Sequence, residues 1–559
     1  MKLKNFRAYR LYDERTENTL LGLEYPKNLG GTGFATVDMD DAERPEKVRL
    51  ALKRKGAKLT GPKARQLKLI NELLSSIEPE SKQLAMKPGF RGRGFVLGEL
   101  TLGSASGAFV WHAPSGKPDI GQVSGSLEAW KTTVAPIVAQ SSFAAVAVLI
   151  GLAAPLVSYV GQHISDTPGL SPLLSETAIW NFSGGSGTGK TTLSRVAAGL
   201  FGSPDAVFKW DFTRPGLEAA AEARNDLVLV LDDIEKHVEI TMSLKNALRL
   251  VGQVIPSGVS KALSPSAKEN GCPERRWCTF GISSSPLPLD TIAERLKWSR
   301  SDGEKVRFID VPVPKATKAG IFDRLPEGTK DRVGAGKAAI TELERHLALQ
   351  YGSAFPAWIE YLLTRSRALK IQKYAASFVD RVAGDGTGYD KRYAEKFAVL
   401  YAAGKLAIEA GILPWDNSLP WKAVAKCYKL ALKSAASADA QAATKVELLR
   451  SLLQQPERFP KLKGTGTKVV EYKPKTLGVR TRIKGRRVCA LRDTEIQAFA
   501  GSKAVAKAIR KRLAEVGALN PGQGTAGTSQ PGIKVQIGKK VSKPRFWIID
   551  EAKLESITN

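Results

Sequence analysis

The sequence predicts an α/β protein organised around a parallel β-sheet. Residues 178–202 read as an apolar strand, a glycine-rich loop and a helix with one apolar face. Residues 226–235 form a second apolar run, which ends in adjacent carboxylates. Between about residues 335 and 451 the chain is rich in alanine, and its large apolar side chains recur at near-helical spacing. Strands that alternate with helices are typical of parallel sheets covered by helices.

The glycine-rich loop fits the G-x-x-x-x-G-K-[ST] pattern of a phosphate-binding loop, the Walker A motif. Its glycines let successive backbone N–H groups surround phosphates, its lysine spans the β- and γ-phosphates, and its threonine can bind Mg²⁺. A Gly/Ser turn that fits by chance is the alternative, but the flanking strand and helix favour a site for ATP and Mg²⁺. The predicted nucleotide-binding residues are Gly184, Gly185, Ser186, Gly187, Thr188, Gly189, Lys190, Thr191 and Thr192.

The second apolar run has the pattern of a Walker B strand. A buried strand of this kind places its first carboxylate, Asp232, near Mg²⁺, and the next acid, Asp233, orients the attacking water. The alternative is a buried strand that ends in solvated acids. We therefore predict Lys190 and both aspartates as catalytic residues, with Thr191 and Asp232 as metal ligands.

Two further groups of residues are candidates for catalysis. An apolar run over residues 276–282 ends in serines, and a polar side chain at this point can contact the γ-phosphate; Ser283 and Ser284 are the candidates, with a simple strand cap as the alternative. Arg295, Arg300 and Arg307 follow, and Arg307 falls in the apolar stretch KVRFIDVPVP, which predicts a strand. Any of them could act as an arginine finger on a neighbouring subunit, although each alone is commonly a surface cation.

The charge of the chain points to a polyanionic partner. The formal net charge is +29 over 559 residues, and residues 461–559 carry 22 Lys and Arg against 7 Asp and Glu. Nucleic acid and an anionic membrane surface are the two classes of partner that such a balance favours. The length suggests about three or four domains.

The basic C-terminal region has the outline of a winged helix. Residues 494–499 and 503–516 read as helices, and residues 533–537 and 545–549 read as strands of a hairpin with a basic tip. A second basic hairpin is predicted around residues 255–277. Solvated surface is the alternative in both places. The predicted DNA-binding residues are Lys261 and Lys268 in this second hairpin and Lys503, Lys507, Arg510 and Lys511 on the longer helix.

One segment complicates the interpretation as a soluble protein. Residues 143–160 are almost wholly apolar and long enough to span a bilayer. The segment is rich in alanine, contains Gly151 and Pro155, and lies just before the glycine-rich loop, so we expect a buried helix rather than a membrane span. The N-terminal sequence lacks the apolar centre of a secretory signal, and the four cysteines show no zinc spacing. We expect a cytoplasmic protein with no membrane partner.

The first 130 residues carry no recognisable site. Residues 48–77 look helical and basic, and residues 89–110 alternate apolar residues with glycines as a twisted sheet would. A small mixed α/β domain fits this pattern, and a scaffold without a site of its own is the plainest interpretation.

From Gly89 to the C-terminus the chain resembles the bacterial and phage family known as domain of unknown function 927. The stretches that carry the resemblance are GFRGRGFVLGELTLG, GSLEAW, SGGSGTGKTTLSRVAAGLFG, LVLVLDDI, ERRW, FIDVP and KRYAEKFAVLYAAGKLAIEAGILPW. Some members of this family are mobile-element helicases similar to MCM-like replicative ATPases. The family usually has Asp-Glu where this chain has two aspartates, so its water-orienting acid is one methylene shorter.

The resemblance implies an AAA+-like P-loop ATPase core followed by a helical lid, in which Arg392 could contact nucleotide; a surface charge is the alternative. The expected domains are residues 1–130, mixed α/β; 131–334, ATPase core; 335–455, lid; and 456–559, winged-helix-like. The expected function is an ATP-dependent DNA helicase or translocase of a phage, plasmid or other mobile element, acting in replication as a homo-oligomer such as a hexamer. A nucleotide-gated DNA-binding initiator or regulator with little hydrolysis is the alternative, and a membrane-associated ATPase is a third.

Overall fold

The structure is a computed structural model, and it divides the chain into two compact units, residues 1–431 and 432–559. The described residues are 5–13, 17–104, 106–112, 120–232, 234, 244–261, 274–436, 438–453, 455–462, 468–472, 476–483, 485–501, 503–519, 533–537 and 540–555. Helices and strands alternate through both units, so the predicted α/β class is confirmed.

The first unit begins with a five-stranded mixed sheet of order β3-β2-β1-β4-β8. The first three strands form an antiparallel meander, while β4 and β8 add in parallel. Helices pack one face of the meander over a buried aliphatic cluster. The predicted helix over residues 48–77 is interrupted by a turn around Gly61 and Pro62, because proline disfavours helical conformation in the residue before it. The elements are β1 (Arg7–Asp13), β2 (Asn18–Pro26), β3 (Thr32–Asp38), α1 (Met39–Ala42), α2 (Pro45–Arg54), α3 (Lys63–Ser75), β4 (Glu78–Ala85) and β8 (Phe109–Trp111).

The glycine-rich stretch after β4 forms the twisted sheet expected from its alternation. Three short antiparallel strands follow one another, namely β5 (Gly89–Arg91), β6 (Gly94–Leu97) and β7 (Leu100–Gly103). Gly103 has φ of +60°, and a Cβ there would lie 2.5 Å from the carbonyl oxygen of Arg93. Only glycine fits this close approach.

A five-stranded, wholly parallel sheet forms the centre of the first unit. Its order is β10-β11-β12-β9-β13, so the strand before the glycine-rich loop lies between the last two strands in sequence. The chain leaves β9 for the far edge and returns towards it, which makes β9 the topological switch point, where open α/β sheets bind their ligands. The strands are β9 (Ile179–Ser183), β10 (Phe208–Lys209), β11 (Val228–Asp232), β12 (Phe280–Ser285) and β13 (Phe308–Pro312).

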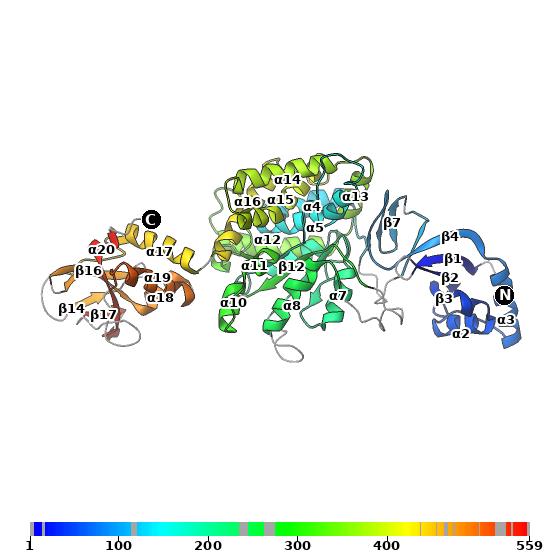
Figure 1. The fold of residues 1–559 in the computed structure, drawn as a ribbon, viewed down its shortest axis with the longest axis horizontal. Helices are drawn as coiled ribbons and strands as arrows, with labels where there is room; N and C mark the ends of the chain where they lie inside the picture. The colour runs from blue at the N-terminus through cyan, green and yellow to red at the C-terminus, as the bar shows by residue number, and fades with distance from the viewer. Residues whose placement is uncertain are drawn as a thin grey trace. The chain divides into compact units, whose positions relative to one another are not determined.

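Helices cover both faces of this sheet (Figure 1). One face packs against α7, α8 and α10 over an apolar cluster that includes Leu231 and Phe308. The other face lies under α5, α6 and α15. These helices are α4 (Leu127–Val138), α5 (Ser142–Gly161), α6 (Lys190–Ala198), α7 (Arg214–Glu222), α8 (Leu244–Ser257), α10 (Leu289–Arg295) and α11 (Asp302–Arg307).

Helix α5 is the apolar segment that was long enough to cross a membrane. Its most apolar window has mean hydropathy 2.2, and 89% of that window is buried inside the protein. A Cβ on Gly151 would lie 2.4 Å from Leu200 Cδ1, so glycine lets the chain after α6 pack closely against α5. The prediction of a buried core helix is confirmed.

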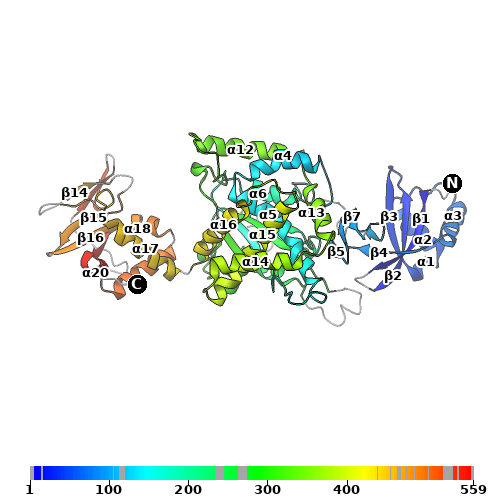
Figure 2. The ribbon, with the colours of Figure 1, turned by 90° about the horizontal axis from the view of Figure 1, so that it is seen from above.

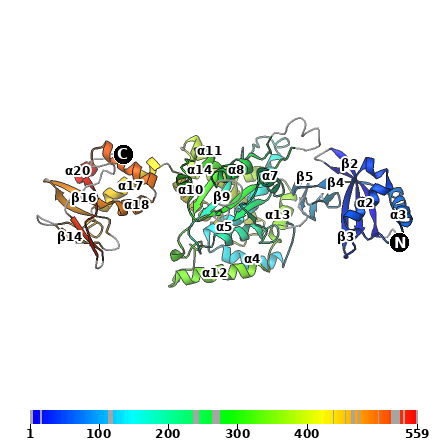
Figure 3. The same cartoon turned by 90° about the horizontal axis from the view of Figure 1, so that it is seen from below.

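A helical region follows β13 and returns to the sheet. Figures 2 and 3 show α12 running beside α4, and Ser126 and Gln350 at the ends of this pair are joined by a hydrogen bond. Helix α15 packs along α5 and α14. The helices are α12 (Arg332–Leu347), α13 (Ala354–Leu363), α14 (Ala368–Ala383), α15 (Gly388–Glu409) and α16 (Leu419–Ala435).

The second unit has two three-stranded sheets, ordered β15-β16-β19 and β14-β17-β18. The helices predicted over residues 494–499 and 503–516 are present as α18 and α19. The predicted hairpin differs, because β17 pairs with β18, whereas β19 pairs with β16. Helix α17, which the sequence placed in the lid, packs against α19. The elements are α17 (Ala438–Leu453), β14 (Lys468–Glu471), β15 (Gly478–Ile483), β16 (Arg486–Arg492), α18 (Asp493–Ala500), α19 (Lys503–Glu515), β17 (Ile533–Ile537), β18 (Lys540–Ser542), β19 (Phe546–Asp550) and α20 (Glu551–Glu555).

A buried carboxylic acid joins the central sheet to the β5 strand. Asp226 accepts hydrogen bonds from Ser158 Oγ at 2.5 Å and from the backbone N–H of Phe90 at 3.1 Å. Burial raises the pKa of this carboxyl from 3.8 to about 6, and these hydrogen bonds oppose the rise. A raised pKa means that Asp226 stabilises the fold below pH 4 and loses this contribution as pH rises through about 6.

We therefore expect Asp226→Asn to remove one pH-dependent contribution to stability. The wild-type protein should lose up to about 3 kcal/mol relative to the variant between about pH 4 and pH 7.5. Thermal unfolding midpoints of both proteins across this range measure the difference. Ser158→Ala is the matched control, since it removes a donor to the carboxylate and should move the transition to higher pH. Parallel pH profiles for wild type and Asp226→Asn would contradict the assignment.

Candidate functional site

The glycine-rich loop joins β9 to α6 and encloses its own lysine. Gly187 and Gly189 have φ of +71° and +94°, a conformation that glycine adopts without strain. Lys190 Nζ donates hydrogen bonds to the carbonyl oxygens of Gly184 at 2.7 Å and Gly185 at 2.9 Å. Gly189 caps α6 without a side-chain hydrogen bond, so the helix begins with backbone donors directed at the loop.

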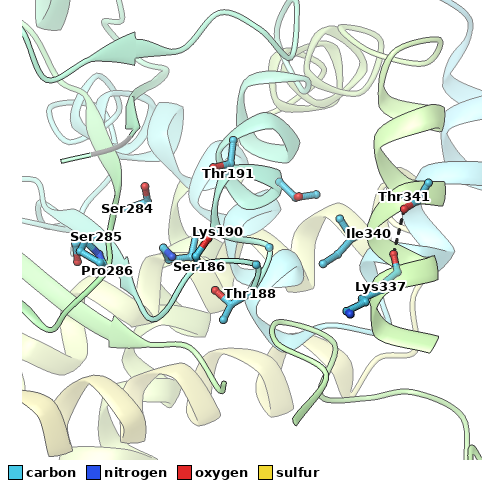
Figure 4. Close-up of a pocket in the computed structure, with 13 residues that line it drawn as sticks. Ser186, Thr188, Lys190, Thr191, Ser284, Ser285, Pro286, Lys337, Ile340 and Thr341 are labelled. Carbon is cyan, nitrogen blue, oxygen red and sulfur yellow. Dashed lines mark hydrogen bonds between the residues drawn. The ribbon is translucent and has the colours of Figure 1, made fainter. Parts of the chain in front are cut away.

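A cavity of about 630 Å³ opens over this loop. Figure 4 shows residues from the end of β12 on one side of the loop and residues of α12 on the other. The lining residues are Ser186, Gly187, Thr188, Gly189, Lys190, Thr191, Thr192, Ser284, Ser285, Pro286, Lys337, Ile340 and Thr341. The loop residues predicted for nucleotide binding and Ser284 therefore share one cavity.

Strand β11 brings a carboxylate to the same end of the sheet. Ser284 Oγ donates a hydrogen bond to Asp232 Oδ1 at 2.5 Å. Side chains alternate along a strand, so Ser283 lies on the opposite face, where it is buried and its hydroxyl has no partner among the described residues. Of the two predicted serines, the structure places Ser284 in the cavity and Ser283 outside it. Asp233 lies outside the described residues.

A buried polar network lies in the sheet directly beneath the loop. Asn181 Nδ2 donates to Asp310 Oδ1 at 2.7 Å and to Ser285 Oγ at 2.8 Å, and Ser183 Oγ donates to Asp310 Oδ2 at 3.0 Å. Gly184 N–H also donates to the carbonyl of Ser285 at 3.0 Å. These bonds hold the start of the loop against the ends of β12 and β13.

Helix α12 supplies cavity residues that the sequence did not reveal. Lys337 is exposed and reaches the cavity from a helix 147 positions after Lys190 in the chain. Thr192 Oγ1 donates to Glu344 Oε1 at 2.8 Å and so joins α6 to α12. No motif marks Lys337, and only the packing of α12 against α4 and α6 shows its place.

The predicted arginines do not lie in this cavity. The side chain of Arg300 is 5% exposed, pairs with Asp290 at 3.3 Å and donates to the backbone carbonyl of Phe308. The guanidinium group of Arg300 is therefore already bound by groups of its own chain. Arg307 is the last residue of α11 rather than part of a strand, because a capping box at Ser301 starts a helix over residues 302–307.

Arg392 lies at the far end of the sheet from the loop. Arg307 and Arg392 both pair with Glu176, at 2.7 and 3.1 Å. Glu176 precedes β9, which is five residues long and so separates it from the loop by about 17 Å. Arg392 therefore does not line the cavity of its own chain, contrary to the expectation for a lid arginine. Both guanidinium groups are partly exposed, at 39% and 52% of their side chains.

The cations predicted to bind DNA fall into two places. Lys261 is exposed beside an antiparallel bridge between Val259 and Arg276, which forms the base of the predicted hairpin. Lys268 lies outside the described residues. On α19, Lys507 and Lys511 are exposed and Arg510 is half-buried, while Ile509 is buried in the core of the second unit. Lys503 begins α19.

The residues around the cavity fit a nucleoside triphosphate. A Cβ added at Gly185 or Gly187 would meet no atom within 4 Å, so the loop leaves space above its backbone. Backbone donors, Lys190 and Lys337 are groups that bind phosphate oxygens. No cluster of three or more His, Cys, Asp or Glu side chains suited to a metal occurs among the described residues.

Comparison with known families and solved structures identifies proteins that this chain resembles. Residues 9–243 match the family model described as domain of unknown function (DUF927). The resemblance inferred from the motifs is thus confirmed, with one correction. The match begins in β1 and so includes nearly all of the N-terminal residues that the motifs had left out, and it ends before α8.

The chain also resembles a solved structure described as "SCCmec type IV Cch - active helicase". The TM-score is 0.54 at 14% sequence identity, and the similarity covers 98% of this chain and 94% of that one. At this identity the likeness shows a shared fold. The curated proteins contain no match.

Proposed function

We propose that this protein is an ATP-dependent DNA helicase or translocase. The observation that carries the proposal is the convergence of the glycine-rich loop, the Asp232–Ser284 pair and Lys337 on one cavity of about 630 Å³ at the switch point of a parallel sheet. Phosphoryl transfer from ATP needs this combination of backbone donors, cations and a carboxylate at the metal position.

Each residue of the site has a distinct role in this proposal. The loop amides and Lys190 bind the β- and γ-phosphates, and Thr191 and Asp232 hold Mg²⁺, which neutralises charge on the phosphates. Asp233 orients the attacking water. Ser284 donates a hydrogen bond to Asp232 and lines the cavity. In this proposal it contacts the γ-phosphate and links it to Asp232 at the end of β11. Lys337 adds a cation from α12.

The arrangement of elements supports an AAA+-like core over residues 131–334 with a helical lid beginning at 335. In this proposal α12 is the first lid helix, and the Thr192–Glu344 hydrogen bond couples its position to the loop helix. The proposed lid extends to residue 455 and so includes α17. That helix, however, packs in the core of the second unit. The remaining domains are residues 1–130 and 456–559.

An oligomer, such as a hexamer, would complete each site with a residue from its neighbour. Arg307 and Arg392 support this better than Arg300 does, because they are exposed and share the single carboxylate of Glu176. Two guanidinium groups on one carboxylate leave a net positive charge at the surface, which suits a phosphate of a second copy.

The second unit supplies a surface for DNA. Two helices, α18 and α19, precede the β17–β18 hairpin, and this order supports a winged-helix-like domain. The buried apolar face of α19 leaves Lys507 and Lys511 at the surface. Lys507, Arg510, Lys511 and Lys503 are the proposed phosphate contacts, with Lys261 and Lys268 as a second group.

The similar solved structure is described as an SCCmec helicase, which supports a place for this protein among helicases of mobile elements. We also propose that the protein acts in replication, lies in the cytoplasm and binds DNA rather than a membrane. The burial of α5 inside the protein supports the cytoplasmic location and the choice of DNA as partner.

The alternative is a nucleotide-gated initiator or regulator that binds ATP and hydrolyses little of it. The shorter acid at Asp233 favours this alternative. Measurement of ATP hydrolysis with and without single-stranded DNA, together with displacement of a labelled strand, separates the two. DNA-stimulated hydrolysis with strand displacement supports the helicase, whereas nucleotide-dependent DNA binding without turnover supports the initiator.

The DNA surface of α19 is tested by replacing Lys503, Lys507, Arg510 and Lys511 by glutamine. Glutamine keeps helix propensity nearly unchanged, so the fold should tolerate the change. Each lost phosphate contact should lower the salt slope of DNA binding by roughly one unit while basal ATP hydrolysis persists. Fluorescence anisotropy with labelled DNA at several salt concentrations measures the slope.

A matched control replaces Lys373, Lys391, Lys422 and Lys429 by glutamine. These exposed lysines lie on α14, α15 and α16 and show no ion pair among the described residues. Both variants lose four charges, so only a difference between them reports specific contacts. Equal slopes for the two variants would assign the α19 face to solvated surface.

A further inference from the structure

The N-terminal domain carries a concentration of positive charge that the proposed ATPase does not use. Between Leu50 and Asn71 the sequence has seven Lys and Arg and no Asp or Glu. We propose that this segment forms a second DNA-binding surface, which binds the phosphate backbone of duplex DNA independently of α19. We define the N-terminal basic surface as Lys27, Lys53, Arg54, Lys55, Lys58, Lys63, Arg65 and Lys68.

Every side chain of the N-terminal basic surface is exposed. Lys63 pairs with Glu46 at 3.1 Å, and that carboxylate also holds Arg49 at 2.7 Å. The other seven cations have no ion pair among the described residues of the chain. A solvated surface commonly mixes both signs of charge, whereas seven of the eight cations of this one have no carboxylate partner among the described residues.

Backbone hydrogen bonds join the parts of the N-terminal basic surface. The β2–β3 turn donates from Asn28 N–H to the carbonyl of Gly56 at 3.0 Å, and Lys58 N–H donates to the carbonyl of Pro26 at 2.8 Å. Helices α2 and α3 pack against each other over the buried residues Leu52 and Ile70. The cations of the turn, of the α2 C-terminus and of the α3 N-terminus are therefore held on one rigid framework.

Two cations lie at the positive end of α3, and among the described residues only Lys63 of the two has a carboxylate partner, Glu46. Lys63 and Arg65 occupy the first turn of a 13-residue helix, and no acidic residue lies in that turn. The positive end of the helix dipole repels cations there, and each such placement costs a few tenths of a kcal/mol or more. A phosphate group would reverse the sign of this interaction, because it is attracted by both the cations and the helix end.

The composition of the N-terminal basic surface favours duplex DNA as its partner over single-stranded nucleic acid and over a membrane. The exposed segments, residues 27–31 and 53–68, contain no Phe, Trp or Tyr, so they offer no platform on which unpaired bases could stack. Leu29 is the one large apolar side chain that stands fully exposed there, at 102%. A membrane-binding surface would need several apolar side chains in addition to its cations.

The test is a surface variant of the full chain in which Lys55, Lys58, Arg65 and Lys68 are replaced by glutamine. Binding to a labelled 30-base-pair duplex of mixed sequence is measured without nucleotide between about 50 and 200 mM salt. The variant should lower the salt slope by about 3 to 4, since each phosphate contact contributes about 0.9. The same loss should appear in the background of the α19 variant, because the two surfaces act separately.

The Lys373/Lys391/Lys422/Lys429 variant is the charge-matched control, and circular dichroism with thermal unfolding checks that the surface variant folds. A second, smaller variant, Lys58→Glu with Lys68→Glu, should weaken duplex binding at least tenfold at 100 mM salt. Slopes and affinities equal to those of the control in both variants would overturn the proposal. So would loss of binding to anionic phospholipid vesicles with unchanged duplex binding, which would assign the surface to membranes. Because the measurement uses no ATP, failure of the proposed ATPase would leave this result unaffected.

Discussion

Replacement of Lys190 by alanine is expected to abolish ATP turnover. In the structure its ammonium group lies against the carbonyl oxygens of Gly184 and Gly185, at the centre of the glycine-rich loop. In the proposed reaction it stabilises the charge that develops on the β- and γ-phosphates. Loss of such a charge-stabilising group costs on the order of 10³-fold in turnover, or about 4 kcal/mol of transition-state stabilisation.

Steady-state hydrolysis and binding of a fluorescent ATP analogue together measure this effect. Lys318→Ala is a suitable control, because this exposed lysine follows β13 in the same unit and does not line the cavity. The control should retain wild-type turnover. Wild-type hydrolysis by Lys190→Ala would mean that the cavity does not bind the phosphates of ATP.

The local elements of this fold could be predicted from the sequence because short-range physics determines them. The strand, loop and helix around Lys190 follow from glycine conformation and apolar periodicity. The same is true of α5, whose almost wholly apolar composition favours burial, and of α19, where Ile509 and Leu513 lie on the buried face. In each case the pattern that predicts the element is contained within a few turns.

The contacts between distant segments could not be predicted in the same way. Lys337 reaches the cavity only because α12 packs on α4 and α6, and no pattern near it records that packing. The choice between Ser283 and Ser284 depends on which face of β12 meets Asp232, which is a matter of register between strands. The second unit shows the same limit, since two apolar strands, β17 and β19, looked like one hairpin and pair with different partners.

The N-terminal basic surface belongs to a third kind of feature. Its charges are evident in the sequence, but a run of cations is usually solvated surface. Three structural facts change its interpretation: the cations are exposed, seven of the eight have no carboxylate partner among the described residues, and Lys63 and Arg65 lie at the positive end of a helix. These facts depend on the folded chain and are not visible in the sequence.

The second large effect is expected at the end of β11, where Asp232→Asn should reduce turnover about 100-fold or more. The carboxylate accepts a hydrogen bond from Ser284 at 2.5 Å and is the proposed protein ligand of Mg²⁺ together with Thr191. An amide keeps the size of the side chain but removes the negative charge that a divalent cation requires. The loss should be partly restored by raising the Mg²⁺ concentration, which a titration of hydrolysis rate against Mg²⁺ measures. Asp211→Asn, an exposed acid in the same unit, is the control.

Variants of the neighbouring acid, Asp233, distinguish the proposed helicase from the nucleotide-gated initiator. In a helicase, Asp233→Asn should leave ATP bound and nearly unhydrolysed, because the attacking water loses its acceptor. Asp233→Glu lengthens the acid by one methylene, and a rise in turnover would show that the shorter side chain limits hydrolysis. If Asp233→Asn hydrolyses ATP at the wild-type rate, the water is oriented by another group, and Glu235 is the nearest acid in the sequence. If wild type and both variants bind ATP without turnover while DNA affinity still responds to nucleotide, the protein is the gated initiator rather than the motor.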